Sequence, residues 1–320
     1  KVSFRIINPA QAEYIVISNK LLMQPASGYS DPVKAYAGFR ASEVGGEYDT
    51  LVVSVDQLYN QFNYGETSPR AIYEFMRFLV NEGSPKYLFL IGKGRDVSAD
   101  YHRIVNPAAS IVKDLVPTAG SPASDMAFTA GLDGTSYEPA VPTGRLSAST
   151  AAQVAAYLNK IKEIETGNVD PSWQKKGLHL SGGIQPNELI AFREYLDGFK
   201  SIAEDTLWGG AISTIAKRDP NPVEFINVSD KVNEGVNLIT FFGHSSPGTI
   251  DIDIGYVSDP TMGYNNPGKY PTFLINGCNA GNFFSGSTAF GEDWILTANK
   301  GARNFIAHSS FGFVNSLQYY

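Results

Sequence analysis

The sequence predicts an α/β protein with a doubly wound, mostly parallel sheet. Short apolar runs rich in β-branched and aromatic residues recur along the chain, and each fits a buried parallel strand. Segments with apolar residues at helical spacing lie between these runs, and glycine or proline marks most of the junctions. Such an alternation of strands and helices is typical of layered α/β architectures, in which crossovers between parallel strands are right-handed.

The expected elements follow this pattern in order. Strands are expected at residues 13–18, 49–55, 86–92, 178–183, 211–216, 237–244, 271–278 and 303–307. Helices are expected at residues 69–83, 149–166, 187–207, 222–234 and 288–299, with weak helical periodicity at 30–44. Short extended pieces are expected at 115–118, 125–129 and 141–146, in a region rich in proline and glycine.

The chain has 320 residues, which is enough for one large domain or two ordinary ones. Residues 167–176, which include Pro171, are the best linker candidate because the alternation restarts after them. We therefore expect an N-terminal α/β subdomain at 1–166 and a C-terminal one at 177–320. Both ends look like cuts through a longer protein, so further domains of the same chain are expected.

Composition excludes several classes of protein. The apolar fraction of 43% and the charged fraction of 18% are those of an ordinary globular protein. The net charge of −7 argues against nucleic acid as a partner. No apolar stretch approaches the roughly 18 residues of a membrane span, so we expect no membrane insertion. A single cysteine also excludes an internal disulfide.

Two of the predicted strands, 237–244 and 271–278, end in residues that could carry chemistry. The first ends in His244 and the second in Cys278, the only cysteine. Parallel strands present their carboxyl ends at one edge of a sheet, where ligands bind. A histidine there could take the thiol proton and later donate it to a leaving amine. The backbone N–H groups of Ser245 and Cys278 would be natural donors to an oxyanion.

Other readings of these residues stay open. A lone cysteine is most often a small buried hydrophobe, although Cys278 ends its strand instead of lying within it. Residues 243–247 almost match the G-x-S-x-G motif of serine hydrolases, but the last position is Pro247. His308 also ends a predicted strand and is followed by two serines, as His244 is, and the strand pattern alone does not rank the two histidines.

Carboxylates near the predicted edge are further candidates. Glu188 lies at the start of a predicted helix, where it could orient His244 by accepting from its far nitrogen, or could simply be a favourable first-turn acid. Asp251 and Asp253 alternate with isoleucines, so they either form the polar face of a strand or line a substrate cleft. Four aspartates in irregular segments could hold calcium, although solvated turns are the simpler reading: Asp96, Asp100, Asp125 and Asp133.

Several motifs together resemble one family. They are Phe242–His244, Gly277–Gly281, Glu292–Leu296 with Lys300–Ala302, Tyr87–Gly92 and Pro142–Leu146. With these motifs, nearly the whole chain resembles the gingipain-type cysteine peptidases of the caspase/legumain clan. The mark of that clan is an apolar strand that ends in histidine, followed by an apolar strand that ends in cysteine. The clan usually has glycine after this histidine, where this chain has Ser245.

The resemblance implies a caspase-like three-layer sandwich with a mostly parallel sheet and two α/β subdomains side by side. It implies a cysteine endopeptidase in which Cys278 is the nucleophile, His244 the base and Glu188 the acid that orients it. No cofactor is implied for catalysis, and a structural calcium ion is possible. A catalytically silent, peptidase-like binding module of a surface protein is the alternative.

The branch that the chain resembles most is the sortase of the type IX secretion system. This implies a bacterial protein that is secreted or held at the cell surface. Its substrates would be exported or surface polypeptides, cleaved by hydrolysis or transferred to an amine.

Overall fold

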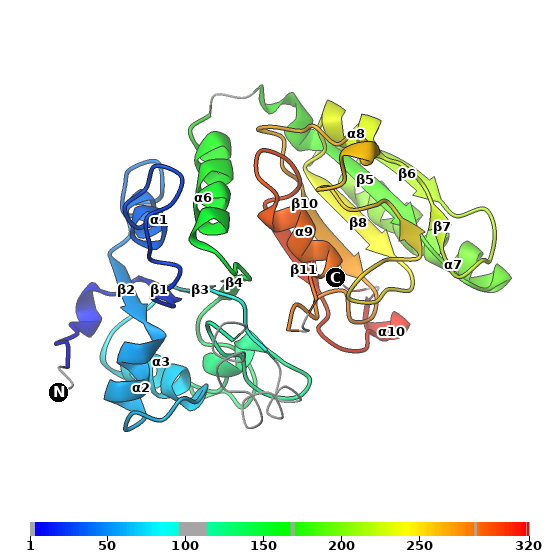
Figure 1. Cartoon of the computed structure of the whole chain (residues 1–320). Helices are drawn as coiled ribbons and strands as arrows, with labels where there is room; N and C mark the ends of the chain where they lie inside the picture. The colour runs from blue at the N-terminus through cyan, green and yellow to red at the C-terminus, as the bar shows by residue number, and fades with distance from the viewer. Residues whose placement is uncertain (1–3, 96–113, 168–169, 285–286, 318, 320) are drawn as a thin grey trace. The chain divides into compact units, whose positions relative to one another are not determined.

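The chain forms two compact units, Lys1–Leu158 and Asn159–Tyr320, and each has its own parallel sheet (Figure 1). The computed structural model describes residues 4–95, 114–167, 170–284, 287–317 and 319. The division falls within helix α6 (Ala151–Glu165). The predicted linker, 167–176, includes the 3-10 helix η4 (Pro171–Lys175) and the first residue of β5.

The first unit is built on a four-stranded sheet in the order β2-β1-β3-β4. Its strands, all paired in parallel, are β1 (Tyr14–Ser18), β2 (Thr50–Ser54), β3 (Tyr87–Ile91) and β4 (Thr143–Leu146). Its helices include α1 (Pro32–Arg40), α2 (Val55–Phe62) and α3 (Arg70–Glu82). The sequence therefore placed these four strands within a few residues of their bounds.

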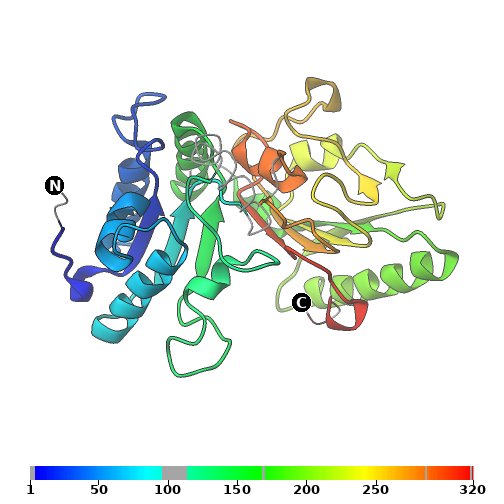
Figure 2. The ribbon, with the colours of Figure 1, turned by 60° about the horizontal axis from the view of Figure 1, so that its bottom comes forward.

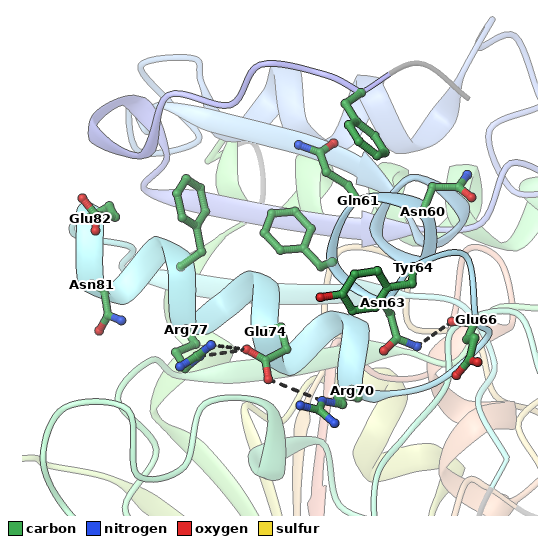
Figure 3. A pocket seen from close by; sticks show the side chains of 13 residues that line it. Asn60, Gln61, Asn63, Tyr64, Glu66, Arg70, Glu74, Arg77, Asn81 and Glu82 are labelled. Atoms are coloured by element: carbon green, nitrogen blue, oxygen red, sulfur yellow. Dashed lines mark hydrogen bonds and ion pairs between the residues drawn. The ribbon is translucent and has the colours of Figure 1, made fainter. Parts of the chain in front are cut away.

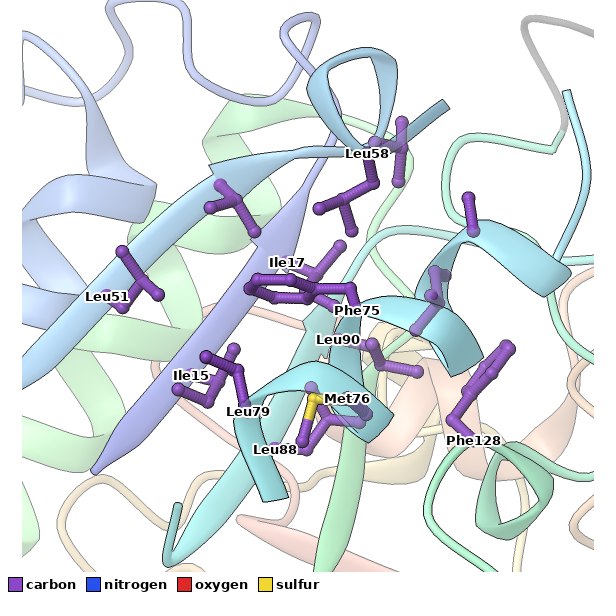
Figure 4. Packing of buried hydrophobic residues seen from close by; sticks show 14 of the residues in the cluster. Ile15, Ile17, Leu51, Leu58, Phe75, Met76, Leu79, Leu88, Leu90 and Phe128 are labelled. Atoms are coloured by element: carbon purple, nitrogen blue, oxygen red, sulfur yellow. The ribbon is translucent and has the colours of Figure 1, made fainter. Parts of the chain in front are cut away.

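Apolar side chains cover both faces of this sheet. On one face Phe75 of α3 packs among Ile15, Ile17 and the leucines of neighbouring strands (Figure 4). On the other face the ring of Phe89 lies 4.9 Å from that of Tyr36 and 6.2 Å from that of Tyr157, between ring centroids. Because side chains alternate along a strand, β1 and β3 supply both layers, and helices cover the sheet on each side.

Helix α2 is an element that the sequence analysis missed. The strand β2 ends at Ser54, whose hydroxyl accepts from the N–H of Gln57 at 3.3 Å and so caps the helix that follows at once. Val55, Leu58 and Tyr59 then form its buried stripe. The region of 125–129 also differs, because it contains the 3-10 helix η3 (Asp125–Phe128) instead of an extended piece.

A single buried arginine organises the proline-rich region before β4. The guanidinium of Arg145 forms a bidentate ion pair with Asp125, at 2.7 Å for both contacts. It also donates to the carbonyls of Gly92, Val116 and Pro117 at 2.6, 2.7 and 3.0 Å. One side chain therefore supplies the hydrogen bonds that a regular strand would otherwise provide to these segments.

The second unit contains a five-stranded parallel sheet in the order β11-β10-β8-β5-β6. The strands are β5 (Lys176–Ser181), β6 (Ala211–Ala216), β8 (Leu238–Phe242), β10 (Thr272–Asn276) and β11 (Asn304–Ala307). All five were predicted from the sequence. The predicted helix at 222–234 is instead the short strand β7 (Glu224–Phe225), which pairs with β9 (Ile252–Asp253), followed by α8 (Ser229–Glu234).

Helices cover both faces of this sheet (Figure 2). Phe242 packs on one face with Phe192 of α7 (Pro186–Ala203) and Leu317 of α10 (Val314–Leu317). Phe241 faces the opposite cluster, to which α8 and α9 (Phe290–Leu296) contribute. The unit is thus a three-layer α/β sandwich, and the predicted α/β class is confirmed.

Candidate active site

His244 and Cys278 follow adjacent strands at equivalent positions. In the parallel pairing of β8 with β10, Phe242 lies opposite Asn276. The N–H of Gly243 then donates to the carbonyl of Asn276 at 3.1 Å. Since each functional residue comes two positions after this matched pair, both leave the sheet at the same carboxyl edge (Figure 1).

A glycine lets the two strand ends approach closely. A Cβ atom on Gly277 would lie 2.3 Å from the Oγ atom of Ser245, which is closer than real Cβ contacts come. The Ser245 hydroxyl donates to the carbonyl of Cys278 at 2.7 Å. The side chain that stands in place of the clan's usual glycine is therefore engaged with the backbone of the cysteine, and not with a histidine base.

Glu188 contacts the imidazole of His244 from the first turn of α7, the helix that follows the neighbouring strand β5. Its Oε2 atom lies 3.1 Å from the Nε2 atom of His244. The same oxygen accepts from the N–H groups of Ile184 and Gln185, at 2.9 and 3.1 Å, and completes the capping box of α7. Glu188 is thus both a first-turn cap of α7 and the carboxylate in contact with His244.

The surroundings of Glu188 favour its charged form. Partial burial raises the pKa of its carboxyl group, but the hydrogen bonds from Ile184 and His244 lower it by more. The pKa therefore lies below its ordinary value. A carboxylate that accepts from Nε2 keeps the proton of neutral His244 on that nitrogen, and leaves the lone pair on Nδ1.

Cys278 is a free, half-buried thiol held in an irregular loop. Asn279, the next residue, has a φ of 57°, and its N–H donates to the carbonyl of Ser310 at 2.8 Å. The N–H of Gly281 donates to the carbonyl of His308 at 2.9 Å. The segment after β11 therefore supports the cysteine loop through its backbone, and His308 belongs to that segment.

Two backbone N–H groups follow the strands β8 and β10 at this edge of the sheet. In the described part of the chain, the N–H groups of Ser245 and Cys278 donate to no protein acceptor. Ser245 follows β8 and Cys278 follows β10, where the two strand ends approach closely. Such unpaired N–H groups are the donors that stabilise an oxyanion in acyl transfer.

The model of peptidase family C25 matches residues 7–320. The chain belongs to peptidase family C25. No curated protein sequence matches it.

Solved structures share the fold of this C25 member. The Arg-specific cysteine proteinase gingipain R is 16% identical, with a TM-score of 0.68 over 95% of this chain and 64% of that one. The complex of its pro- and mature domains from Porphyromonas gingivalis is 17% identical, with a TM-score of 0.69 over 96% and 66%. A structure described only as a protease is 17% identical, with a TM-score of 0.68 over 97% of this chain and 62% of that one. The predicted caspase-like fold is confirmed, and the chain spans less than two thirds of each of these proteins.

The described residues of this C25 chain offer no obvious metal site, since they contain no cluster of three histidine, cysteine, aspartate or glutamate side chains. Of the four candidate aspartates, Asp125 is paired with Arg145, and Asp133 accepts from the N–H and hydroxyl groups of Thr135. Asp96 and Asp100 lie outside the described residues. No described helix is long and apolar enough to cross a membrane.

A cavity of about 920 Å³ lies in the first unit, beside α2 and α3 (Figure 3). Glu74 lies at its edge, in ion pairs with Arg70 at 3.5 Å and Arg77 at 2.6 Å. All of its lining residues are described, and none is a cysteine, serine or histidine. The chemistry of this C25 member therefore does not centre on it.

The sequence analysis left the role of Asp251 open, and the structure gives it a definite place. Its side chain is buried and accepts from the backbone N–H of His244 at 3.2 Å. The alternation with isoleucines was a signal of burial, but it could not show which backbone groups the carboxylate meets. Asp253 is half-buried and accepts from the N–H of Gly255 at 2.9 Å.

Proposed function

We propose that this chain is the catalytic part of a cysteine endopeptidase that cleaves polypeptides. The observation that carries the proposal is the contact of Glu188 with His244, at the sheet edge where Cys278 follows the adjacent strand. Membership of peptidase family C25 supports the same reaction. Cys278 is then the nucleophile, His244 the base and Glu188 the acid that orients it.

The reaction follows from these positions. Nδ1 of His244 takes the proton of the Cys278 thiol, and the thiolate attacks the carbonyl carbon of the scissile bond. The carbonyl electrons move to the oxygen, which accepts hydrogen bonds from the N–H groups of Ser245 and Cys278. As the intermediate collapses, His244 returns the proton to the leaving amine, and a thioester remains. Water, activated by His244, then releases the acid and restores the thiol.

The test uses the fact that the chain has one cysteine. An electrophilic peptide probe should label the wild-type protein at Cys278, and peptide-library cleavage should be lost in Cys278→Ala. Ser245→Ala is the matched control, since it also removes one heavy atom, from a side chain that contacts the backbone of Cys278. Its turnover should stay within about one order of magnitude of wild type, because only a backbone N–H of this residue is used.

The outcomes separate the candidate functions. Cleavage that survives Cys278→Ala but disappears in Ser245→Ala would identify a serine hydrolase instead. A folded protein that neither cleaves peptides nor reacts with the probe would support the silent binding module. The contact that favours this module is the carbonyl of Gly312, 3.7 Å from the Cys278 Sγ atom, which covers one side of the thiol.

The finer assignment rests on the resemblance alone. It makes the protein a secreted or surface-held bacterial enzyme of the type IX sortase branch, acting on exported proteins by hydrolysis or by transfer to an amine. Adding an amine nucleophile to a cleavage assay and weighing the products distinguishes water from amine as the acceptor. The structural calcium ion also stays a proposal, which a shift of the melting temperature on adding calcium after chelation would support.

A further inference from the structure

Asp251 joins the end of β5, the strand that leads into the helix carrying Glu188, to the end of β8, the strand that leads to His244. Its Oδ2 atom accepts from the N–H of Gly183, just after β5, at 2.8 Å. The same oxygen accepts from the N–H of His244, just after β8, at 3.2 Å. The N–H of Asp251 returns a hydrogen bond to the carbonyl of His244 at 2.8 Å. One residue therefore fixes the backbone of His244 on both sides.

Glycines make room for this carboxylate at both strand ends. A Cβ atom on Gly182 would lie 2.0 Å from Oδ1 of Asp251, and one on Gly243 would lie 2.7 Å from the same atom. Neither distance is possible between real atoms, so any larger residue at these positions would displace the carboxylate. The ends of β5 and β8 are thus shaped around Asp251.

The link to Glu188 runs through the loop that begins at Gly183. This glycine has a φ of 130°, and a Cβ atom there would lie 3.1 Å from the carbonyl carbon of Glu188 and 2.9 Å from the nitrogen of Leu189. The next residue, Ile184, donates its N–H to the Glu188 carboxylate at 2.9 Å. A shift of Gly183 would therefore move the turn that holds Glu188.

We propose that Asp251 is a positioning residue that sets the contact between Glu188 and His244 by anchoring the backbone of both strand ends. Its effect on turnover rests on the proposed peptidase function, whereas its effect on the contact itself does not. Asp251 acts through backbone groups and touches no reacting atom, which separates it from the three residues assigned to catalysis.

The bonding of Asp251 differs from that of an ordinary buried side chain. It is 3% exposed, and its Oδ1 atom has no hydrogen-bond partner among the described residues. Leaving a buried polar atom unpaired destabilises a fold, so packing alone gives no reason for a carboxylate here. Burial raises the pKa of this carboxyl group above its ordinary value, and the hydrogen bonds from the N–H groups of Gly183 and His244 oppose that shift.

The first test compares three variants in the whole chain. Asp251→Ala removes the acceptor, Asp251→Asn keeps an oxygen that can accept from both N–H groups, and Asp253→Ala is the matched control two residues away. The direct readout is the ¹⁵N chemical shift of Nε2 of His244, which reports its hydrogen bond to Glu188. The chain has four histidines, so a His244→Ala spectrum assigns the signal.

The expected result is specific to positioning. In Asp251→Ala the Nε2 signal should move to its position in Glu188→Gln, and kcat should fall about 10- to 100-fold with KM within about twofold. Asp251→Asn and Asp253→Ala should keep the wild-type signal and a kcat within about threefold of wild type. An unchanged Nε2 signal in Asp251→Ala, or an Asp251→Asn as impaired as the alanine variant, would overturn the proposal.

A second variant keeps the test decisive if Asp251→Ala does not fold. Gly182→Ala leaves Asp251 in place but displaces its carboxylate, so the same Nε2 shift is expected. Gly198→Ala on α7 is its control, since a Cβ atom there meets nothing within 4 Å. A Gly182→Ala protein with the wild-type Nε2 signal would refute the proposal. If the wild-type protein shows no turnover, the peptidase proposal fails, while the NMR comparison still decides whether Asp251 sets the contact.

Discussion

At the scale of single residues, the candidate site depends on the contact of the Glu188 carboxylate with the imidazole of His244 at 3.1 Å, which the first turn of α7 holds in place. The position of His244 and Cys278 at one edge of the sheet could be predicted, because parallel strands present their carboxyl ends at the same edge. The meeting of Glu188 with His244 depends on where α7 begins, which the capping box fixes. The anchoring by Asp251 could not be predicted, because its Oδ2 atom accepts from the N–H of Gly183, 68 residues away in sequence, as well as from that of His244.

The contact between Glu188 and His244 leads to a prediction at this scale. Glu188→Gln removes the charge while keeping an oxygen that can accept from the N–H groups of Ile184 and Gln185, just before α7. A hydrogen bond to a charged group contributes about 1.5–3 kcal/mol, so kcat should fall about 10- to 150-fold while the helix stays capped. Glu194→Gln, at an exposed position on the same helix, is the control and should have wild-type kcat.

The stability of the protein in acid provides a second test of the contact between Glu188 and His244. Because the pKa of Glu188 lies below its ordinary value, its contribution to stability is fully present above about pH 4.5 and is lost as the pH falls through the folded-state pKa. The stability of Glu188→Gln should therefore decline less steeply in acid than that of wild type. Parallel acid-denaturation curves for the two proteins would contradict the assignment.

At the scale of elements, the strands were predicted because buried parallel strands are continuous apolar runs. The elements that were predicted wrongly or not at all depend on contacts that apolar runs do not reveal. Helix α2 begins directly at the end of β2, and no turn lies between the strand and the helix. The N-cap hydrogen bond to Ser54 is the one local signal of the change. The segments around 115–128 depend on Arg145, whose charge meets Asp125 and carbonyls that are distant in sequence.

Lys160 ties one helix to the end of another within the second unit. It is 1% exposed and donates from its ammonium group to the carbonyls of Trp294 and Ile295 at the end of α9, at 3.4 and 2.9 Å. A cation is favourable at a helix C-terminus, but burial disfavours it. Burial is the larger effect, and it lowers the pKa of Lys160 from 10.5 to about 7.

This shift predicts how stability changes with pH. Between about pH 7 and 10.5 the unfolded chain binds a proton at Lys160 that the folded chain does not, so stability should rise with pH, by about 1.4 kcal/mol per unit at most. Below about pH 7 this group adds no slope. Lys160→Met should abolish the rise, whereas Lys231→Met, at an exposed position, should keep it.

Urea unfolding at pH 6.5, 7.5 and 8.5 measures the effect. All three tryptophans, Trp173, Trp208 and Trp294, belong to the second unit, so their fluorescence reports its unfolding. An equal rise in the wild-type and Lys160→Met proteins would show that the lysine stays charged when folded.

At the scale of the whole molecule, the sequence predicted two α/β parts, and the structure contains two compact units with separate sheets. Each unit has its own apolar cluster: that of the first gathers around Phe75, and that of the second includes Phe273. A unit with its own core can unfold independently of the other unit. The spacing of apolar residues along the sequence does not show that the two cores are separate.

Separate cores predict separate responses to a cavity. Phe75→Ala and Phe273→Ala each empty a fully buried site and should cost about 3–5 kcal/mol in the unit that contains it. Since tryptophan fluorescence reports the second unit alone, Phe75→Ala should leave the fluorescence midpoint in urea unchanged while part of the circular-dichroism transition moves to lower urea. Phe273→Ala should move the fluorescence midpoint itself. A fluorescence midpoint that falls equally in both variants would mean that the units unfold as one, and that neither core is sufficient by itself.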